Sequence, residues 1–151
     1  MKLPLIISAC LLGQNTKYNG KNNYNDAVKY LEEYFDFIPI CPEVEGGLPV
    51  PRDPAEIIGD KVVSCMGKDV TLNYETGAQL ALKKCIDNKA KYAVLKSKSP
   101  SCGKGLVYDG KFSGNLIEND GITARLLKEN GINIFTEKEI SLLINEIAKK
   151  S

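Results

Sequence analysis

Short apolar runs recur along the chain and predict the strands of a sheet. Residues 3–9, 37–40, 92–95 and 132–135 are apolar almost throughout. Strands that are buried on both faces of a parallel sheet have this composition, whereas a half-exposed strand alternates apolar and polar residues. We therefore expect four central strands.

Segments between these runs have helical patterns and capping residues. Asn25 or Asp26 can cap one helix, Gly131 is suited to the left-handed position that ends another, and Thr136 with Glu139 forms a capping box for the last. The predicted helices cover residues 26–34, 71–88, 121–130 and 137–149.

Turn-forming residues mark one long loop and two hairpins. Residues 41–54 are dense in proline and glycine, which predicts a shaped loop, and long loops in small domains are usually functional. Residues 56–70 predict a hairpin that turns at Gly59-Asp60, with Val62, Val63 and Met66 in its strands. Residues 106–113 predict a smaller hairpin that turns at Asp109-Gly110.

This order of elements predicts an α/β fold. We expect one Rossmann-like domain over residues 1–151, with a mostly parallel sheet, helices on both faces and a small β-hairpin insertion. The run before Cys10 is shorter than the apolar region of a secretory signal, and no run is long enough to cross a bilayer. We therefore expect a cytoplasmic protein with no membrane partner.

Composition removes several kinds of chemistry. The 151 residues contain no histidine, which excludes Ser-His and Cys-His dyads and every His-ligated metal site. Lysine and arginine number 20 against 19 aspartates and glutamates, so the charge balance does not point to a polyanionic partner. Five cysteines without close pairs are typical of a reducing compartment.

Three of the five cysteines follow predicted strands. Cys10 and Cys41 come directly after the first two strands, and Cys102 lies in the loop after the third. Because the carboxyl ends of parallel strands meet at one edge of a sheet, we expect these three side chains to converge. Cys65, in a predicted strand, and Cys85, on the apolar side of a predicted helix, are expected to be core residues.

The converging cysteines form a candidate metal site, although their spacing matches no standard ligand pattern. Zinc usually has a fourth cysteine in a structural site, and a [4Fe-4S] cluster usually has four. Three thiolates on such a cluster leave one iron open to act as a Lewis acid on a substrate atom. Neighbouring glycine and serine residues expose backbone N–H groups that can hydrogen-bond sulfur.

The residues around these cysteines resemble the TudS-type thiouracil desulfidase family. The matching motifs are Ser8-Ala9-Cys10-Leu11-Leu12-Gly13, Cys41-Pro42-Glu43-Val44-Glu45-Gly46-Gly47-Leu48-Pro49 with Pro51-Arg52, and Ser99-Pro100-Ser101-Cys102-Gly103. Tyr108-Asp109-Gly110 and Gly121-Ile122-Thr123-Ala124 extend the match over essentially the whole chain.

The resemblance implies a cofactor and a reaction. It implies a [4Fe-4S] cluster held by Cys10, Cys41 and Cys102, and non-redox removal of sulfur from a thiolated pyrimidine to give the oxo base and sulfide. Two other functions stay open, namely cluster-dependent thiolation or dethiolation of tRNA, which is less favoured, and a non-catalytic sulfur carrier or metal-binding module.

Such a reaction needs a base for water, and two carboxylates follow Cys41. We favour Glu45, beside two glycines, over Glu43, for which pairing with Arg52 is the alternative. Ser101 is a candidate for binding substrate or water, or a turn-forming residue. Arg52 is a candidate for binding substrate, or a structural residue.

A lysine-rich stretch over residues 83–104 has two interpretations. It is suited to attracting a nucleotide or RNA, but a solvated basic face is the simpler explanation.

Overall fold

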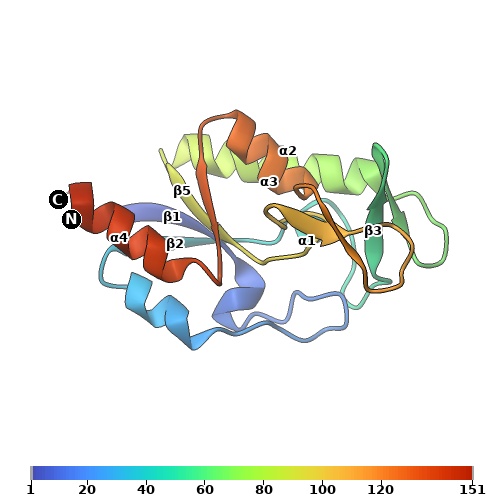
Figure 1. The fold of residues 1–151 in the computed structure, drawn as a ribbon, viewed down its shortest axis with the longest axis horizontal. Helices are drawn as coiled ribbons and strands as arrows, with labels where there is room; N and C mark the ends of the chain where they lie inside the picture. Colours follow the sequence, from blue (N-terminus) through green and yellow to red (C-terminus); the bar gives the residue numbers. More distant parts are fainter. Residues whose placement is uncertain (1, 151) are drawn as a thin grey trace.

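Four parallel strands form the central sheet, in the order β2-β1-β5-β8 (Figure 1). The computed structural model describes residues 2–150. The strands are β1 (Leu3–Ser8), β2 (Phe35–Ile40), β5 (Tyr92–Leu95) and β8 (Asn133–Thr136). All four strands predicted from the apolar runs are present, and the α/β prediction is confirmed.

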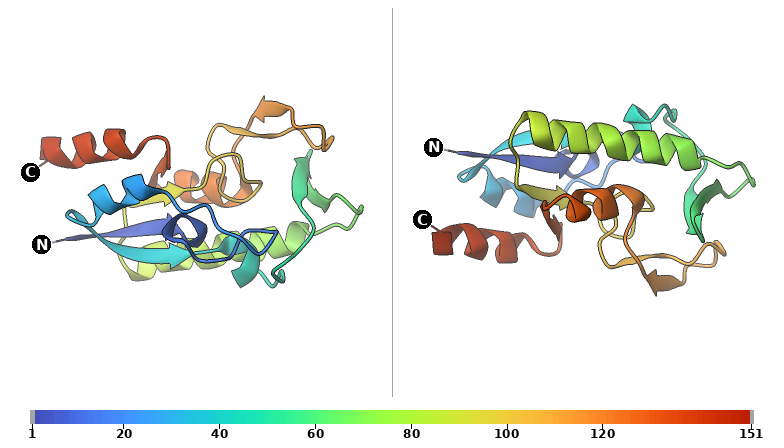
Figure 2. Two further views of the ribbon diagram at one scale, coloured as in Figure 1. Left: turned by 90° about the horizontal axis from the view of Figure 1, so that it is seen from below. Right: turned by 90° about the horizontal axis from the view of Figure 1, so that it is seen from above.

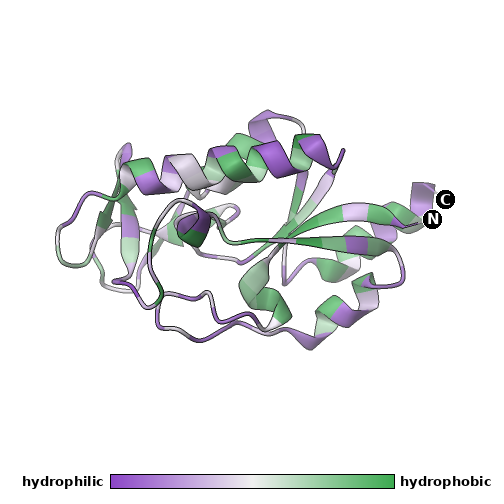
Figure 3. Cartoon of the chain, turned by 180° about the vertical axis from the view of Figure 1, so that it is seen from behind, coloured by the Kyte–Doolittle hydropathy of each residue, from purple (hydrophilic) through white to green (hydrophobic). Residues whose placement is uncertain are grey.

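Helices cover both faces of this sheet. One face packs against α2 (Thr71–Asp87) and α3 (Ile122–Glu129). The other packs against the 3₁₀ helices η1 (Ala9–Leu12) and η2 (Asp26–Leu31) and against α4 (Ile140–Lys150). Figure 3 shows hydrophobic stretches along the central strands and hydrophilic positions on the helices. Within residues 2–150, no helix is both long enough and apolar enough to span a bilayer.

Strand β1 explains why the apolar runs are unbroken. Leu5 and Ile7 face the core on the α4 side, whereas Ile6 faces the core on the α2 side, and all three are fully buried. Alternate side chains point to opposite faces, so a strand with a hydrophobic layer on each side needs apolar residues throughout. Pro39 lies in β2, the strand at one edge of the sheet. An edge strand has a neighbour on one side only, and this is where a residue without a backbone N–H is tolerated in a sheet.

Several predicted elements have different bounds. Asn25 accepts a hydrogen bond from the Ala27 N–H as the expected cap, but the helix that follows is a short 3₁₀ turn ending at Leu31. The predicted loop 41–54 contains a one-turn helix, α1 (Pro42–Glu45).

The hairpins also differ in part. The first is confirmed as β3 (Ala55–Ile58) and β4 (Lys61–Ser64), but Met66 lies beyond it and is exposed. The second joins β6 (Leu106–Tyr108) to β7 (Leu116–Glu118), so the chain turns later than predicted.

The two hairpins lie together at the end of the molecule opposite both termini (Figure 2). Strands β3 and β6 contact each other there. Both hairpins form separate two-stranded sheets beyond the carboxyl ends of the central strands (Figure 2). They therefore enclose the space beyond the carboxyl ends of its strands.

Helix α1 packs directly onto the backbone of α2 at two glycines. A Cβ on Gly77 would lie 1.9 Å from the Pro42 carbonyl oxygen, and one on Gly46 would lie 2.0 Å from the Asn73 carbonyl oxygen. The Asn73 side-chain amide donates to the Gly46 carbonyl at 2.9 Å. Residues without a side chain are required at both points, and this contact fixes α1 relative to the sheet.

Replacing Gly77 with alanine therefore tests the contact. Alanine favours helices more than glycine does, by about 1 kcal/mol, but here its methyl group would push α1 away. We expect Gly77→Ala to lower the free energy of unfolding by about 1–3 kcal/mol, a typical cost of overpacking. Urea denaturation measures the change, with Gln79→Ala, at an exposed position of α2, as the control. Stabilisation by Gly77→Ala would contradict the close packing.

Candidate functional site

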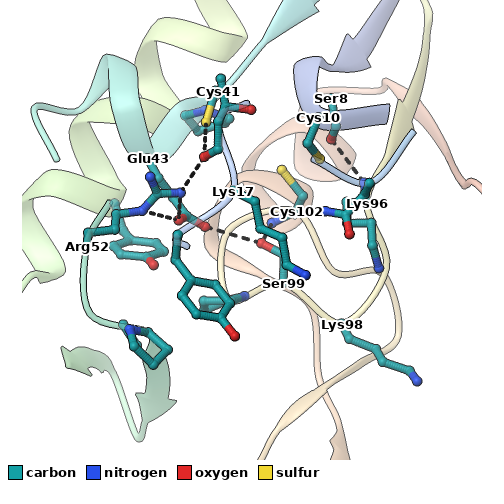
Figure 4. Close-up of a pocket in the computed structure, with 18 of the residues that line it drawn as sticks. Ser8, Cys10, Lys17, Cys41, Glu43, Arg52, Lys96, Lys98, Ser99 and Cys102 are labelled. Carbon is teal, nitrogen blue, oxygen red and sulfur yellow. Dashed lines mark hydrogen bonds and ion pairs between the residues drawn. The ribbon is translucent and has the colours of Figure 1, made fainter. Parts of the chain in front are cut away.

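Three cysteines from three strand-end loops line one pocket (Figure 4). Cys10 lies in η1 after β1, Cys41 follows β2 directly, and Cys102 lies in the loop after β5. The pocket has a volume of about 660 Å³. The structure thus brings together the three cysteines expected to converge, and it does so because their strands are parallel neighbours.

The loops that carry Cys10 and Cys102 are joined across the sheet. The Ser8 hydroxyl accepts a hydrogen bond from the Lys96 N–H at 3.0 Å, over a sequence separation of 88 residues. The Ser8 side chain also hydrogen-bonds Cys102, which lowers the pKa of that thiol against the larger effect of burial. These contacts fix the carboxyl end of β1 relative to that of β5.

Electrostatics favour the protonated form of all three thiols. Burial raises the pKa of Cys10, Cys41 and Cys102, and the negative charge of Glu43 raises each further. The pKa of Cys102 is also raised by the charges that Cys10 and Cys41 would carry as thiolates. A bound metal supplies the positive charge that such thiols need in order to ionise, because metal binding displaces their protons.

The donor set fits an iron–sulfur cluster. Thiolate is the usual protein ligand of these clusters, and the pocket offers three thiols around an open volume. Thr16, a residue of the pocket lining, has the one buried side-chain N or O atom in residues 2–150 with no hydrogen-bond partner, its hydroxyl oxygen. In the same residues, no three His, Cys, Asp or Glu side chains lie close enough to hold a single metal ion.

Glu43 lies beside the thiols and is held by Arg52. The guanidinium donates to one carboxylate oxygen, Oε2, from Nε at 3.0 Å and from Nη2 at 2.6 Å. It donates further to the carbonyls of Thr16 and Pro49. The other oxygen of Glu43, Oε1, accepts a long bond of 3.4 Å from the Ser99 hydroxyl, and the Tyr74 side chain in the same pocket also hydrogen-bonds Glu43. Arg52 is therefore committed to positioning Glu43, the alternative that the sequence left open.

The structure places Glu45 outside the pocket lining, whereas Glu43 is part of it. One oxygen of Glu45 accepts the Cys41 N–H at 2.8 Å and the other pairs with Lys84 at 2.7 Å. Glu45 thus closes the first turn of α1, and its partner holds it against α2. In a single helical turn, Glu43 and Glu45 point in different directions, so only Glu43 faces the cysteines.

Ser101 is also outside the pocket lining. It is fully buried, and its hydroxyl shares a hydrogen bond of 2.8 Å with that of Thr123 at the start of α3. Ser99 occupies the place expected for Ser101, since it lines the pocket. Its hydroxyl accepts the N–H groups of Ser101 and Cys102, both at 3.0 Å. The sequence signal for this was a serine three residues before Cys102, a turn-forming arrangement.

The remaining two cysteines differ from each other. Cys85 is buried in the core between α2 and the sheet, as predicted. The prediction that Cys65 is a core residue is wrong, because β4 ends at Ser64. The Ser64 hydroxyl and carbonyl accept N–H groups of the following turn, which leaves Cys65 exposed at the rim of the pocket.

The lysine-rich stretch does not form one basic surface. Four of its lysines have carboxylate partners: Lys83, Lys84, Lys96 and Lys104. Of the stretch, only Lys96 and Lys98 line the pocket, and Lys17 joins them from another loop. The lysines therefore serve mainly as partners for carboxylates.

Comparisons with known proteins point to one family. The family model described as 2-thiouracil desulfurase matches residues 5–139. A solved structure named as a [4Fe-4S]-dependent thiouracil desulfidase, TudS, has a TM-score of 0.91 and 40% identity, over 97% of this chain and 99% of that one. The uncharacterized protein YbbK of Bacillus subtilis is 37% identical, over 91% of this chain and 97% of its own length.

The pair of Arg52 and Glu43 predicts a stability effect at the site. The side chains of Arg52 and Glu43 are 7% and 15% exposed, so removing the cation leaves a nearly buried carboxylate without a countercharge. We expect Arg52→Ala to lower the free energy of unfolding of the metal-free protein by about 3 kcal/mol. Urea denaturation followed by circular dichroism measures it. Arg125→Ala, which removes an exposed arginine, should change the value by less than about 0.5 kcal/mol. Equal effects of the two variants would contradict the assignment.

Proposed function

This chain belongs to the 2-thiouracil desulfurase family, and we propose that it removes sulfur from a thiolated pyrimidine by hydrolysis, with a [4Fe-4S] cluster as cofactor. The observation that carries the proposal is the pocket in which Cys10, Cys41 and Cys102 surround a space beside Glu43. The similarity to TudS, a [4Fe-4S]-dependent thiouracil desulfidase, supports both the cofactor and the substrate class.

Cys10, Cys41 and Cys102 would hold the cluster through their thiolates. When bound, a cluster with three protein ligands supplies an open iron that acts as a Lewis acid toward the substrate sulfur. The burial of Cys102 and the half-burial of the other two keep bulk water from the ligands.

Glu43 is the proposed general base. The overall reaction converts a thiocarbonyl and water into a carbonyl and hydrogen sulfide, so one water molecule must lose its protons as its oxygen bonds to the ring carbon. Oε1 of Glu43 faces the pocket and accepts the first proton, while Arg52 fixes the carboxylate through Oε2. Glu43 then gives this proton to the departing sulfur, and the C–S bond breaks with its electron pair on sulfur. The second proton leaves the new hydroxyl group as the carbonyl forms and goes to the released sulfide, so no atom changes oxidation state.

Ser99 supports this arrangement from the other side. Its hydroxyl accepts two backbone N–H groups next to Cys102 and donates to Glu43. It therefore connects the loop of one proposed ligand with the proposed base, and it keeps Oε1 directed toward the reacting water. The sequence-based candidate Ser101 stabilises the same loop from behind through Thr123.

The cofactor and the reaction are tested together by chemical analysis and turnover. Anaerobically reconstituted wild-type protein should contain about four iron and four acid-labile sulfide per chain. It should convert 2-thiouracil into uracil and sulfide in equal amounts over many turnovers. Cys10→Ser, Cys41→Ser and Cys102→Ser should lose iron and activity, whereas Cys65→Ser and Cys85→Ala should keep both.

Two results would overturn this proposal. Iron that is indifferent to Cys102→Ser would exclude the three-cysteine site. A cluster with no turnover on any thiolated base would indicate a sulfur carrier instead.

A matched pair of carboxamide variants tests the base. Glu43→Gln removes the proton acceptor and should lower kcat about 100-fold or more with full iron content, since general base catalysis typically contributes that factor. Glu45→Gln keeps an oxygen for the Cys41 N–H and should stay within about threefold of wild type. A large loss of kcat in Glu45→Gln alone would move the base to that residue.

A further inference from the structure

A second carboxylate, Glu56, lies in the wall of the pocket formed by the hairpins. Glu56 belongs to β3, is 9% exposed and lines the same pocket as the three cysteines. Its oxygen Oε1 accepts the N–H of Gly110 at 2.9 Å and the N–H of Phe112 at 3.2 Å. Both donors belong to the loop between β6 and β7, so Glu56 joins the two hairpins that close this end of the molecule.

The other oxygen of Glu56, Oε2, has no hydrogen-bond or ion-pair partner in the described part of the chain. Within residues 2–150, no lysine or arginine pairs with Glu56, and both of its hydrogen bonds end on Oε1. Oε2 is also not among the fully enclosed, unbonded atoms, so it retains open space beside it, which the pocket provides. A nearly buried carboxylate without a countercharge is costly unless a hydrogen-bond donor meets it. The ligand of the pocket can be that donor.

Glu56 also determines the position of an aromatic side chain. Phe112 has a φ of 54°, a left-handed conformation that is rare for a residue with a bulky side chain. Gly110 lies so close to β3 that a Cβ there would be 2.7 Å from the Ile57 carbonyl oxygen. The bonds to Glu56 hold this loop in place, and the pocket lining includes Phe112 from the loop and Tyr108 from the end of β6. An unusual backbone conformation held by a buried side chain is typical of a functional site.

The roles of the two pocket carboxylates are different. Glu43 raises the pKa of all three thiols, which places its charge near their sulfur atoms, and Arg52 neutralises it. Glu56 comes from the hairpin wall, lines the pocket together with Tyr108 and Phe112, and has one acceptor oxygen that no donor in residues 2–150 occupies. One wall is therefore equipped for chemistry, and the other for binding a flat ring that has a hydrogen-bond donor on its edge.

Thiolated uracils have this combination of features. The ring is flat and aromatic side chains can stack on it, and each thiocarbonyl carbon is bonded to at least one ring N–H. We propose that Oε2 of Glu56 accepts the ring N–H next to the thiocarbonyl group, while Phe112 packs against the ring. This inference rests on the proposed function and deepens it, because it names the residue that selects the substrate. Rings whose nitrogen at that position is methylated or lacks a proton leave the carboxylate unpaired and are rejected.

A conservative substitution separates recognition from loop structure. In Glu56→Gln the amide oxygen can still accept the N–H groups of Gly110 and Phe112, which orients the amide and places its NH₂ group where Oε2 was. That group is a donor and cannot accept the ring N–H. We expect KM for 2-thiouracil to rise about 10- to 100-fold, the usual effect of losing a hydrogen bond to a charged group, with kcat within about threefold of wild type. Glu75→Gln, at an exposed position of α2, is the control.

Methylated substrates supply the second half of the test. Wild type, Glu56→Gln and Glu75→Gln, all reconstituted and matched for iron content and Tm, are assayed with 2-thiouracil and with its 1-methyl and 3-methyl derivatives. One of the two methyl groups should lower kcat/KM of wild type and of Glu75→Gln about 10-fold or more. The same methyl group should have little further effect on Glu56→Gln, because the bond it removes is already absent.

The outcomes distinguish this inference from the function on which it rests. Wild type that releases no sulfide from 2-thiouracil overturns the proposed function. Active wild type with an unchanged KM in Glu56→Gln, or with the same methyl effects in all three proteins, overturns the role of Glu56 alone. A fall in kcat at constant KM would also overturn it, and would make Glu56 a proton-transfer group.

Discussion

Close approach of backbone to backbone at glycine residues is the constraint on which the geometry of the site depends. Gly77 lets α1 rest against α2, which directs Glu43 toward the cysteines. Gly103 and Gly121 do the same for the third cysteine loop, since a Cβ on either would lie within 2.7 Å of the carbonyl oxygen of Ser99 or Ser101. These contacts leave no space for a side chain, so the loops have few other positions available. A parallel sheet brings the loops together, and the glycines fix their separation.

The pocket combines groups that are unfavourable when empty. Three thiols that burial keeps protonated, a carboxylate held by one arginine, and a hydroxyl without a partner lie around one space. The thiols and the hydroxyl lose hydration on folding and gain little from the protein alone, and the carboxylate depends on a single cation. Function accounts for such an arrangement, because a positively charged cofactor and a polar substrate supply the missing interactions when they bind. The rest of the fold, with its two apolar layers, provides the stability that this site does not.

A feature of this structure could be predicted from the sequence when residues close along the chain determine it, and not when contacts with distant residues do. The strands follow from local composition, and the convergence of the cysteines follows from one general property of parallel sheets. Which of Glu43 and Glu45 lines the pocket depends on the direction of a single helical turn, and the contact with Gly77 fixes that turn. Ser101 and Ser99 differ only in which side of a tight turn each faces. The predicted burial of Cys65 depended on where β4 ends, and the ends of elements are the least reliable part of a prediction from sequence. The four-stranded core could thus be predicted from the sequence, whereas the direction in which individual side chains point could not.

The hydrogen bond between the Ser8 hydroxyl and the Lys96 N–H also has a consequence for the order of events after synthesis. It links residues 88 positions apart, and β5 pairs with β1 over a similar separation. Contacts between distant parts of a chain form late in folding, because the loop between them must close first. While only Cys10 and Cys41 have emerged from the ribosome, the pocket has not formed. Iron that reaches the chain at that stage meets isolated thiols. The pocket that we propose for the cluster is therefore complete only after the ribosome has released the segment that carries Cys102.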